Sequence, residues 1–202
     1  MRAKLAVLAS GLGTNLQAII DAQRLGNLPV DIVGVLSNNP DAPALDRARN
    51  HGISTAVCLV NEYPDRDSYG RKLVHQLRSW QTTIVALAGF MLLIPPVLVQ
   101  AFQHRILNIH PALLPSFKGL NAQRQALAHG VRISGCTVHL VDEGMDTGPI
   151  ILQAAVPVLP TDTEDSLSAR ILAEEHRLYP EAIRLLALNK IKVSGRKVQI
   201  LE

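Results

Sequence analysis

The sequence predicts an α/β protein in which helices cover both faces of a mostly parallel β-sheet. In the first half of the chain, short apolar runs alternate with segments of helical periodicity, which is the pattern that βαβ units produce. The apolar runs are continuous rather than alternating, as expected for strands that are buried on both faces. A length of 202 residues with 48% hydrophobic residues is enough for one substantial core, so we expect a single domain.

The predicted parallel strands are separated by predicted helices along the first half of the chain. Strands are expected at residues 4–10, 30–38, 54–60, 82–89 and 105–111, and helices at residues 15–24, 43–51, 67–80 and 95–102. The first strand resembles the start of a signal peptide, but its apolar segment is too short for one. The apolar stretch from Ile84 to Val99 contains Gly89, Pro95 and Pro96 and is too short to span a bilayer. The sequence therefore predicts a soluble protein.

The pattern changes after Pro115. Two further strands, at residues 133–141 and 150–158, are joined by a short loop, so we expect them to pair antiparallel and to extend the sheet. Residues 161–188 indicate one long helix or two helices that break near Pro180, with Thr163 or Asp165 as the N-cap. Residues 192–201 predict a small hairpin around Ser194 and Gly195. The whole pattern predicts one Rossmann-like domain with an antiparallel C-terminal extension of its sheet.

Charge and cysteine usage argue against several classes of protein. The formal net charge is only +3, and the 20 basic residues are scattered among 17 acidic ones, which does not favour a nucleic-acid-binding surface. The two cysteines, Cys58 and Cys136, lie in apolar stretches without the spacing of metal ligands. Buried thiols in a reducing compartment fit them better than a disulfide, so we expect a cytoplasmic protein without a structural metal.

The first candidate site is "ASGLGTN", residues 9–15, which follows the first strand and begins a helix. Glycines at positions 11 and 13 let the backbone approach a ligand closely, and free N–H groups at the helix start favour an anion such as phosphate. The loop matches neither the complete dinucleotide fingerprint nor a Walker A loop. A tight turn capped by Thr14 or Asn15 explains the same residues equally well.

The second candidate is the pair Asn108 and His110 in "NIHPALLP". The two residues are two positions apart in a predicted strand, so their side chains project from the same face. Pro111 and Pro115 end the strand, which places both side chains at the carboxyl end of a parallel strand, where open α/β sheets bind ligands. Each residue alone could also be an ordinary hydrogen-bonded polar residue.

The third candidate is the loop "DEGMDTGP", residues 142–149, with the acids Asp142, Glu143 and Asp146. A solvated turn is the simplest interpretation, and the loop lacks the alternating oxygen ligands of an EF-hand. An aspartate that faced His110 would favour the imidazolium ion and raise the pKa of the histidine. We assign no role to five other histidines that lack ligand spacing, which are His51, His75, His104, His129 and His139.

Over nearly its whole length, the chain resembles the folate-dependent phosphoribosylglycinamide formyltransferases. The resemblance rests on "SGLGTNLQAIIDA", "AGFMLLIPP", "LNIHPALLPSFKGLNAQRQAL", "GCTVHLVDEGMDTGPII" and "EEHRLYP", in the order of that family. The triad of Asn, His-Pro and DxGxxDTGP is specific to the wider folate formyltransferase superfamily. The segments "SGLGTN" and "FKGLNAQRQAL" favour this family over methionyl-tRNA formyltransferases, which carry an RGAAP-like stretch and an added C-terminal domain for which 202 residues leave no room.

The resemblance implies a formyltransferase fold across residues 1–202, with a phosphate-binding half at about 1–100 and a catalytic, folate-binding half at about 85–190. It implies transfer of the formyl group of 10-formyltetrahydrofolate, a co-substrate, to the amine of glycinamide ribonucleotide in de novo purine biosynthesis. No metal is needed, because the formyl group is already activated on the folate. The implied partners are these small molecules, with no nucleic acid or membrane, and the implied state is a cytoplasmic monomer or weak homodimer.

The same resemblance implies a role for each matching residue. Asn108 and His110 would stabilise the tetrahedral oxyanion, and Asp146 would raise the pKa of His110 and keep it protonated near neutral pH. The residues that would bind glycinamide ribonucleotide are Gly13, Thr14 and Asn15 at its phosphate and Glu175 at its glycinamide end.

The folate-side contacts that the resemblance implies are Arg66, Met91, Leu92, Leu93, Ile94 and Asn108. The segment 91–94 would act mainly through its backbone and through apolar packing. Leu92 departs from the longer polar side chain of some relatives, which leaves open what its side chain does. Thr14 keeps the hydroxyl of the serine that is common at its position.

Two other functions fit part of the sequence. A 10-formyltetrahydrofolate hydrolase would use the same triad with water in place of the amine, but such relatives carry an N-terminal regulatory domain, whereas the first strand here begins at about residue 4. A noncatalytic folate- or nucleotide-binding domain would not require Asn108, His110 and Asp146 together.

Overall fold

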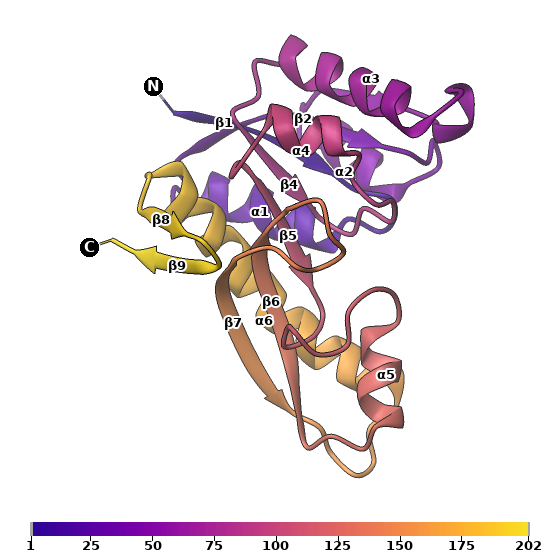
Figure 1. Ribbon diagram of the computed structural model, residues 1–202, viewed down its shortest axis with the longest axis vertical. Coiled ribbons are helices and arrows are strands. Elements are labelled where there is room, and N and C mark those ends of the chain that lie inside the picture. The colour runs from indigo at the N-terminus through magenta and orange to yellow at the C-terminus, as the bar shows by residue number, and fades with distance from the viewer. Residues whose placement is uncertain (1, 202) are drawn as a thin grey trace.

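The computed structural model describes residues 2–201 and contains a seven-stranded sheet with helices on both faces (Figure 1). The strand order is β3-β2-β1-β4-β5-β6-β7. The first five strands pair parallel, and β6 and β7 pair antiparallel, as the sequence predicts. The strands are β1 (Ala3–Leu8), β2 (Val30–Ser37), β3 (Thr55–Val57), β4 (Ile84–Leu87), β5 (Ile106–His110), β6 (Ile133–Leu140) and β7 (Ile150–Pro157).

The helices lie close to the predicted ranges, with one addition. They are α1 (Thr14–Arg24), α2 (Pro43–Asn50), α3 (Arg66–Ser79), α4 (Pro96–Ala101), α5 (Ala122–Ala128) and α6 (Glu164–Ala187), and a 3₁₀ turn covers Val60–Glu62. The additional helix is α5, which the sequence pattern does not predict. This short helix buries only two small side chains, Ala122 and Ala126, so it has little hydrophobic periodicity to reveal it.

The two faces of the sheet carry separate hydrophobic cores. Leu5 and Val7 of β1 point into the core formed with α1, α2 and α6, whereas Ala6 and Leu8 point into the core formed with α3 and α4. Alternate residues of a strand point to opposite faces, so a strand that is covered on both sides must be apolar at every position. This double burial explains the continuous apolar runs of the sequence.

Helix α6 is one continuous helix of 24 residues, not a broken pair, although Pro180 lies inside it. In Figure 1 it runs behind β6 and β7 and covers their inner face. It begins after Thr163, whose side chain accepts the N–H of Ser166 at 3.2 Å while the Ser166 hydroxyl accepts the N–H of Thr163 at 3.0 Å. Thr163 is therefore the N-cap, and the alternative prediction of Asp165 is wrong. Burial of Tyr179 and Ile183 on either side of the proline holds the helix together.

The remaining features follow the sequence closely. Strands β8 (Ile191–Ser194) and β9 (Lys197–Ile200) form the predicted hairpin, with Gly195 in its turn at φ +58°. Cys58 and Cys136 are both buried and free. Among residues 2–201, no helix is both long and apolar enough to cross a membrane.

Candidate active site

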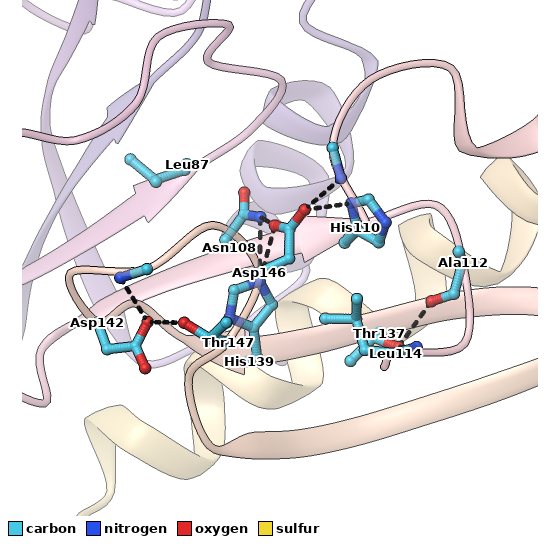
Figure 2. A network of polar contacts seen from close by, with 12 residues as sticks. Leu87, Asn108, His110, Ala112, Leu114, Thr137, His139, Asp142, Asp146 and Thr147 are labelled. Carbon is cyan, nitrogen blue, oxygen red and sulfur yellow. Dashed lines mark hydrogen bonds and ion pairs between the residues drawn. The ribbon is translucent and has the colours of Figure 1, made fainter. Parts of the chain in front are cut away.

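Asn108 and His110 lie at the carboxyl end of β5, at the junction between the parallel and antiparallel parts of the sheet. Strand β4 runs parallel to β5 on one side, and β6 runs antiparallel on the other, where it places His139 opposite Asn108 and Thr137 opposite His110. Figure 2 shows Asn108 and His110 facing the same carboxylate, as their spacing in the strand predicts. His110 is buried, with 4% of its surface exposed.

The segment after His110 is held by Thr137. The Thr137 hydroxyl donates to the carbonyl oxygen of Ala112 at 2.7 Å and accepts the N–H of Leu114 at 3.0 Å (Figure 2). Gln153 adds a bond from its amide nitrogen to the Leu114 carbonyl at 3.0 Å. These buried bonds fix the stiff turn that the prolines predict, and with it the end of β5.

Asp146 comes from the loop between β6 and β7 and meets both residues of the pair. Its Oδ2 lies 3.4 Å from His110 Nδ1 and accepts the backbone N–H of Gly119 at 2.8 Å. Its Oδ1 lies 3.5 Å from the amide nitrogen of Asn108. The structure thus brings Asn108, His110 and Asp146 together from segments 36 residues apart in the chain (110 to 146).

Asp146 is ionised in this setting. Burial alone would raise its pKa, but the contact with His139, the Gly119 N–H and the neighbouring His110 together hold the pKa below its usual range. The loop around it supports itself, because Asp142 accepts the hydroxyl of Thr147 at 2.6 Å and the N–H of Gly144 at 3.2 Å. Within residues 2–201, no group of three His, Cys, Asp or Glu side chains could hold a metal ion.

His139 belongs to the cluster, although its spacing along the chain predicted no role for it. Its Nδ1 lies 2.8 Å from the Leu140 carbonyl and therefore carries a proton. Its Nε2 lies 3.2 Å from the Asn108 amide nitrogen and 3.5 Å from Asp146 Oδ1, so the ring contacts both residues. Metal-ligand spacing was the wrong criterion for this residue. The available signal was the antiparallel pairing of the two strands, which places His139 beside Asn108.

The net shift in the pKa of His110 is opposite to the predicted increase. Its Nε2 lies 2.8 Å from the carbonyl oxygen of Phe117, so this nitrogen carries a proton while Nδ1 faces Asp146. Burial lowers the pKa of His110, and this effect outweighs the Asp146 charge and the Phe117 bond, which both raise the pKa. Asp146 therefore acts in the predicted direction, but the net pKa lies below the ordinary value, because the surroundings of His110 exclude water.

The loop before α1 has the geometry of an anion site. Gly13 has φ +71° and occupies the N-cap position, where a Cβ atom would lie 2.7 Å from the Cβ of Ala44. Only glycine fits this position. No side chain caps α1, so the alternative prediction of a cap by Thr14 or Asn15 is wrong. The first N–H groups of α1 remain without intrahelical acceptors, which favours a negatively charged ligand.

Asn15 and Glu175 are joined across the core. The Asn15 amide nitrogen donates to Glu175 Oε2 at 2.7 Å, and both side chains are buried. Burial raises the pKa of Glu175, and the Asn15 bond only partly offsets this. Glu175 on α6 is thus tied directly to the loop that carries Gly13 and Thr14, so the four residues predicted to bind one substrate form one region.

The segment 91–94 lies beside Arg66 and beside the first loop. Arg66 Nη2 donates to the Ile94 carbonyl at 2.8 Å, and the Met91 N–H donates to the Ser10 hydroxyl at 2.8 Å. The side chains of Met91 and Leu93 are 63% and 47% exposed, and Leu92 packs against the core formed with α3 and α4. Ile94 is 4% exposed and its side chain packs in the same core, so the contact predicted for it depends mainly on its backbone.

Comparison with known families places this geometry among formyl transferases. Residues 3–183 match the family model described as formyl transferase. The Escherichia coli phosphoribosylglycinamide formyltransferase is 43% identical over 187 residues, which cover 93% of this chain and 88% of that protein. A Drosophila melanogaster trifunctional purine biosynthetic protein is 46% identical over 92% of this chain, but the match spans only 14% of that longer protein.

Solved structures agree. The glycinamide ribonucleotide transformylase 1 of Symbiobacterium toebii matches with a TM-score of 0.98 at 51% identity, covering all of this chain and 95% of that one. A formyltetrahydrofolate deformylase from Pseudomonas syringae matches with a TM-score of 0.93, at 26% identity and over 67% of its own length. The fold is shared by both kinds of protein, whereas the sequence is much nearer to the transformylase.

Proposed function

The chain belongs to the phosphoribosylglycinamide formyltransferases within the formyl transferase family, and we propose that Asn108, His110 and Asp146 are its catalytic residues. Its reaction moves a formyl group from 10-formyltetrahydrofolate to the amine of glycinamide ribonucleotide, in purine biosynthesis. The observation that carries the assignment of residues is the convergence of an amide, an imidazole and an ionised carboxylate at the end of β5.

The transfer forms one bond and breaks another at the same carbon. The amine nitrogen of glycinamide ribonucleotide attacks the formyl carbon, and the carbonyl oxygen becomes an oxyanion. The attacking nitrogen loses a proton, and the oxyanion then re-forms the carbonyl as the bond to the folate nitrogen breaks and that nitrogen gains a proton. The protein must therefore supply hydrogen-bond donors at the oxyanion and a proton for the leaving nitrogen. An amide N–H and an imidazolium N–H meet these two needs.

Asn108 supplies the fixed donor. One side of the Asn108 amide nitrogen faces the His139 ring, 3.2 Å from its Nε2, and this contact orients the side chain. The second N–H points toward Asp146 Oδ1 at 3.5 Å, a long and weak contact that a developing oxyanion could replace. His139 is therefore proposed as the residue that positions Asn108.

His110 supplies the second donor, and its imidazole ring gains and loses a proton during the reaction. As an imidazolium it donates to Asp146 through Nδ1 and keeps Nε2–H for the oxyanion or for the leaving nitrogen. In the described structure Nε2–H is bonded to the Phe117 carbonyl at 2.8 Å. Substrate binding must therefore exchange this carbonyl for the reacting group. Because burial lowers the pKa of His110, the growing negative charge of the oxyanion is needed to favour the imidazolium.

The two substrates are assigned to the two regions beside this cluster. We propose that Gly13, Thr14 and Asn15 hold the ribonucleotide phosphate with the start of α1, and that Glu175 orients the glycinamide end. On the folate side, Arg66 holds the backbone of the segment 91–94, and Met91 and Leu93 present exposed apolar surface, which fits an aromatic pterin. In this proposal residues 1–100 approximately form the phosphate-binding half, and residues 85–190 the catalytic, folate-binding half.

The deciding experiment is a spectrophotometric assay of the purified protein with 10-formyltetrahydrofolate, with and without glycinamide ribonucleotide. Deformylation that requires the ribonucleotide supports the transferase. Deformylation without it would support the hydrolase, which the match to the Pseudomonas syringae deformylase keeps as the second candidate. The lower identity of 26%, against 43% and 51% for the transferases, favours the first outcome.

We further propose that the protein works in the cytoplasm as a monomer or weak homodimer, without nucleic acid or membrane. The buried free thiols suit a reducing compartment, and the charge of +3 is too evenly spread for a nucleic-acid surface. Sedimentation velocity across a hundredfold range of protein concentration would test the oligomeric state, and a stable larger assembly would contradict it.

A further inference from the structure

Arg47 connects α2 to the glycine loop, although it lies far from that loop in the sequence. Its Nε donates to the Leu12 carbonyl at 2.7 Å, and its Nη1 lies 3.4 Å from the side-chain oxygen of Gln17 in α1. The side chain is half-buried, so its position is set by the protein rather than by solvent. Arg47 therefore bridges the loop and the helix that follows it.

Helix α2 orients the backbone of the loop as a whole. The N–H of Ala44 donates to the Gly11 carbonyl at 3.1 Å, next to the bond from Arg47 to the Leu12 carbonyl. Two consecutive carbonyl groups of the loop are thus directed toward α2, and Gly13 is packed against Ala44. A loop whose carbonyls are held away on one side can present its N–H groups to an anion on the other.

Arg47 also makes no ion pair in the described part of the chain, unlike two arginines near it, although Asp21 and Glu181 line the same cavity. It lines a cavity of about 550 Å³ between α1 and α6 together with Thr14, Arg177 and Arg184. Arg177 and Arg184 are each paired with a glutamate of α6 at 2.7 Å. Arg47 bonds to neutral oxygen atoms, and in the described part of the chain no carboxylate lies within ion-pair distance of it. Partial burial also reduces the screening of its charge by water.

We propose that Arg47 is a positioning residue that makes the enzyme specific for a phosphorylated substrate. It holds the Leu12 carbonyl away from the anion and leaves one positive charge beside Thr14, so the loop binds phosphate more tightly than its N–H groups alone would. This inference rests on the proposed function, because it takes the glycine loop as the phosphate site. It adds a residue outside the loop, on a different helix.

The test compares phosphorylated and unphosphorylated substrates in matched variants. Arg47→Gln removes the charge, Arg47→Lys retains the charge but not the fixed guanidinium bond, and Arg49→Gln is the control, because Arg49 lies exposed on the same helix and pairs with Asp46. For Arg47→Gln we expect the KM for glycinamide ribonucleotide to rise about tenfold or more. The kcat and the KM for 10-formyltetrahydrofolate should remain within about twofold. The KM of Arg47→Lys for glycinamide ribonucleotide should lie between the values of Arg47→Gln and of the unmodified protein.

Three readouts separate this role from a merely structural one. With the dephosphorylated glycinamide riboside, kcat/KM of Arg47→Gln should equal that of the unmodified enzyme, and the KM effect on the phosphorylated substrate should shrink at high salt. In calorimetry, Arg47→Gln should weaken the binding of ribose 5-phosphate, whereas Arg49→Gln should not. An equal loss with both substrates, or an unchanged affinity for ribose 5-phosphate, would overturn the inference. Failure of the proposed function is distinguishable, because it would abolish formyl transfer in the unmodified protein while leaving the calorimetry to decide on Arg47.

Discussion

In the proposed function, the cluster at the end of β5 and the loop before α1 serve one reaction by different physical means. The cluster uses side chains that are buried and joined to one another, so its behaviour depends on which atoms carry protons. The loop uses backbone N–H groups, whose hydrogen-bonding character does not change with pH, and its conformation depends on a glycine with positive φ. The difference teaches that the chemistry depends on the protonation of buried side chains, whereas binding of the ribonucleotide depends on backbone shape and on the fixed charge of Arg47, which do not change with pH near neutrality.

The largest effect that would separate the two regions is expected from replacing His110. His110→Ala should lower kcat by roughly 10²–10³-fold, because a donor aimed at the oxyanion is lost. The KM for glycinamide ribonucleotide should change little, since the phosphate loop is untouched. Steady-state kinetics measures both, with His75→Ala, an exposed histidine of α3, as the control. Equal losses in binding and turnover would contradict the division between the two regions.

The next largest effect is expected from Asp146→Asn. Asp146 raises the pKa of His110, so its neutralisation should lower that pKa further and move the alkaline fall of kcat/KM to lower pH. Above neutral pH the rate should drop on the order of tenfold or more. Asp142→Asn is the matched control, because Asp142 lies in the same loop but bonds to Thr147 rather than to His110. A pH profile that coincides with that of the control would exclude this electrostatic role.

A third prediction tests the backbone shape of the loop, with the charge of Arg47 left in place. Gly13→Ala should weaken binding of glycinamide ribonucleotide about tenfold and destabilise the fold by roughly 1–3 kcal/mol, since the new Cβ would clash with Ala44 at a positive φ. The pH dependence of kcat should keep its form. Gly11→Ala is the control, because no atom lies within 4 Å of the Cβ it would add. If both alanine variants bind the ribonucleotide normally, backbone shape is not what the loop depends on.

The smallest effect concerns stability. Because burial lowers the pKa of His110 in the folded state, the unfolded chain binds more protons, and stability is lost as pH falls below the ordinary pKa of about 6.5. His110→Gln removes this titration, so its Tm should fall less than that of the unmodified protein between pH 7.5 and 5, by roughly 2–4 °C. Calorimetric melting curves at several pH values would show it, and parallel curves for the two proteins would count against the lowered pKa.

Much of the fold could be predicted because its two kinds of element differ in hydrophobic pattern. The parallel strands are buried on both faces and form continuous apolar runs, whereas the helices are apolar on one side only. The pair Asn108 and His110 could be found from spacing and the prolines behind it, and Asp146 from a glycine-rich loop, with the resemblance to a family supplying their roles. His139 could not be found by spacing along the chain, since its role depends on the register of β5 against β6. Arg47 was also missed, because its bond to Leu12 joins α2 to the loop before α1 through tertiary packing.

The pKa of His110 shows a different limit of sequence reasoning. The sign of the effect of Asp146 follows from charge alone and could be predicted once the two residues were paired. Burial lowers the pKa of His110, and the size of this effect depends on how completely the protein encloses the imidazole ring. No local sequence pattern predicts that enclosure. The continuity of α6 through Pro180 has the same origin, because packing against the sheet outweighs a missing backbone bond.

In the proposed mechanism, the bond between His110 and the Phe117 carbonyl lets His110 stabilise the transition state more than the bound substrate. If a formyl oxygen takes the place of this carbonyl, one neutral acceptor replaces another, and the free energy changes little. An oxyanion is a much stronger acceptor, so the gain grows only as negative charge develops. The bond to Phe117 that is lost on binding therefore offsets the bond that His110 gains to the formyl oxygen in the ground state. What remains is stabilisation of the transition state, which accelerates the reaction instead of merely tightening the complex.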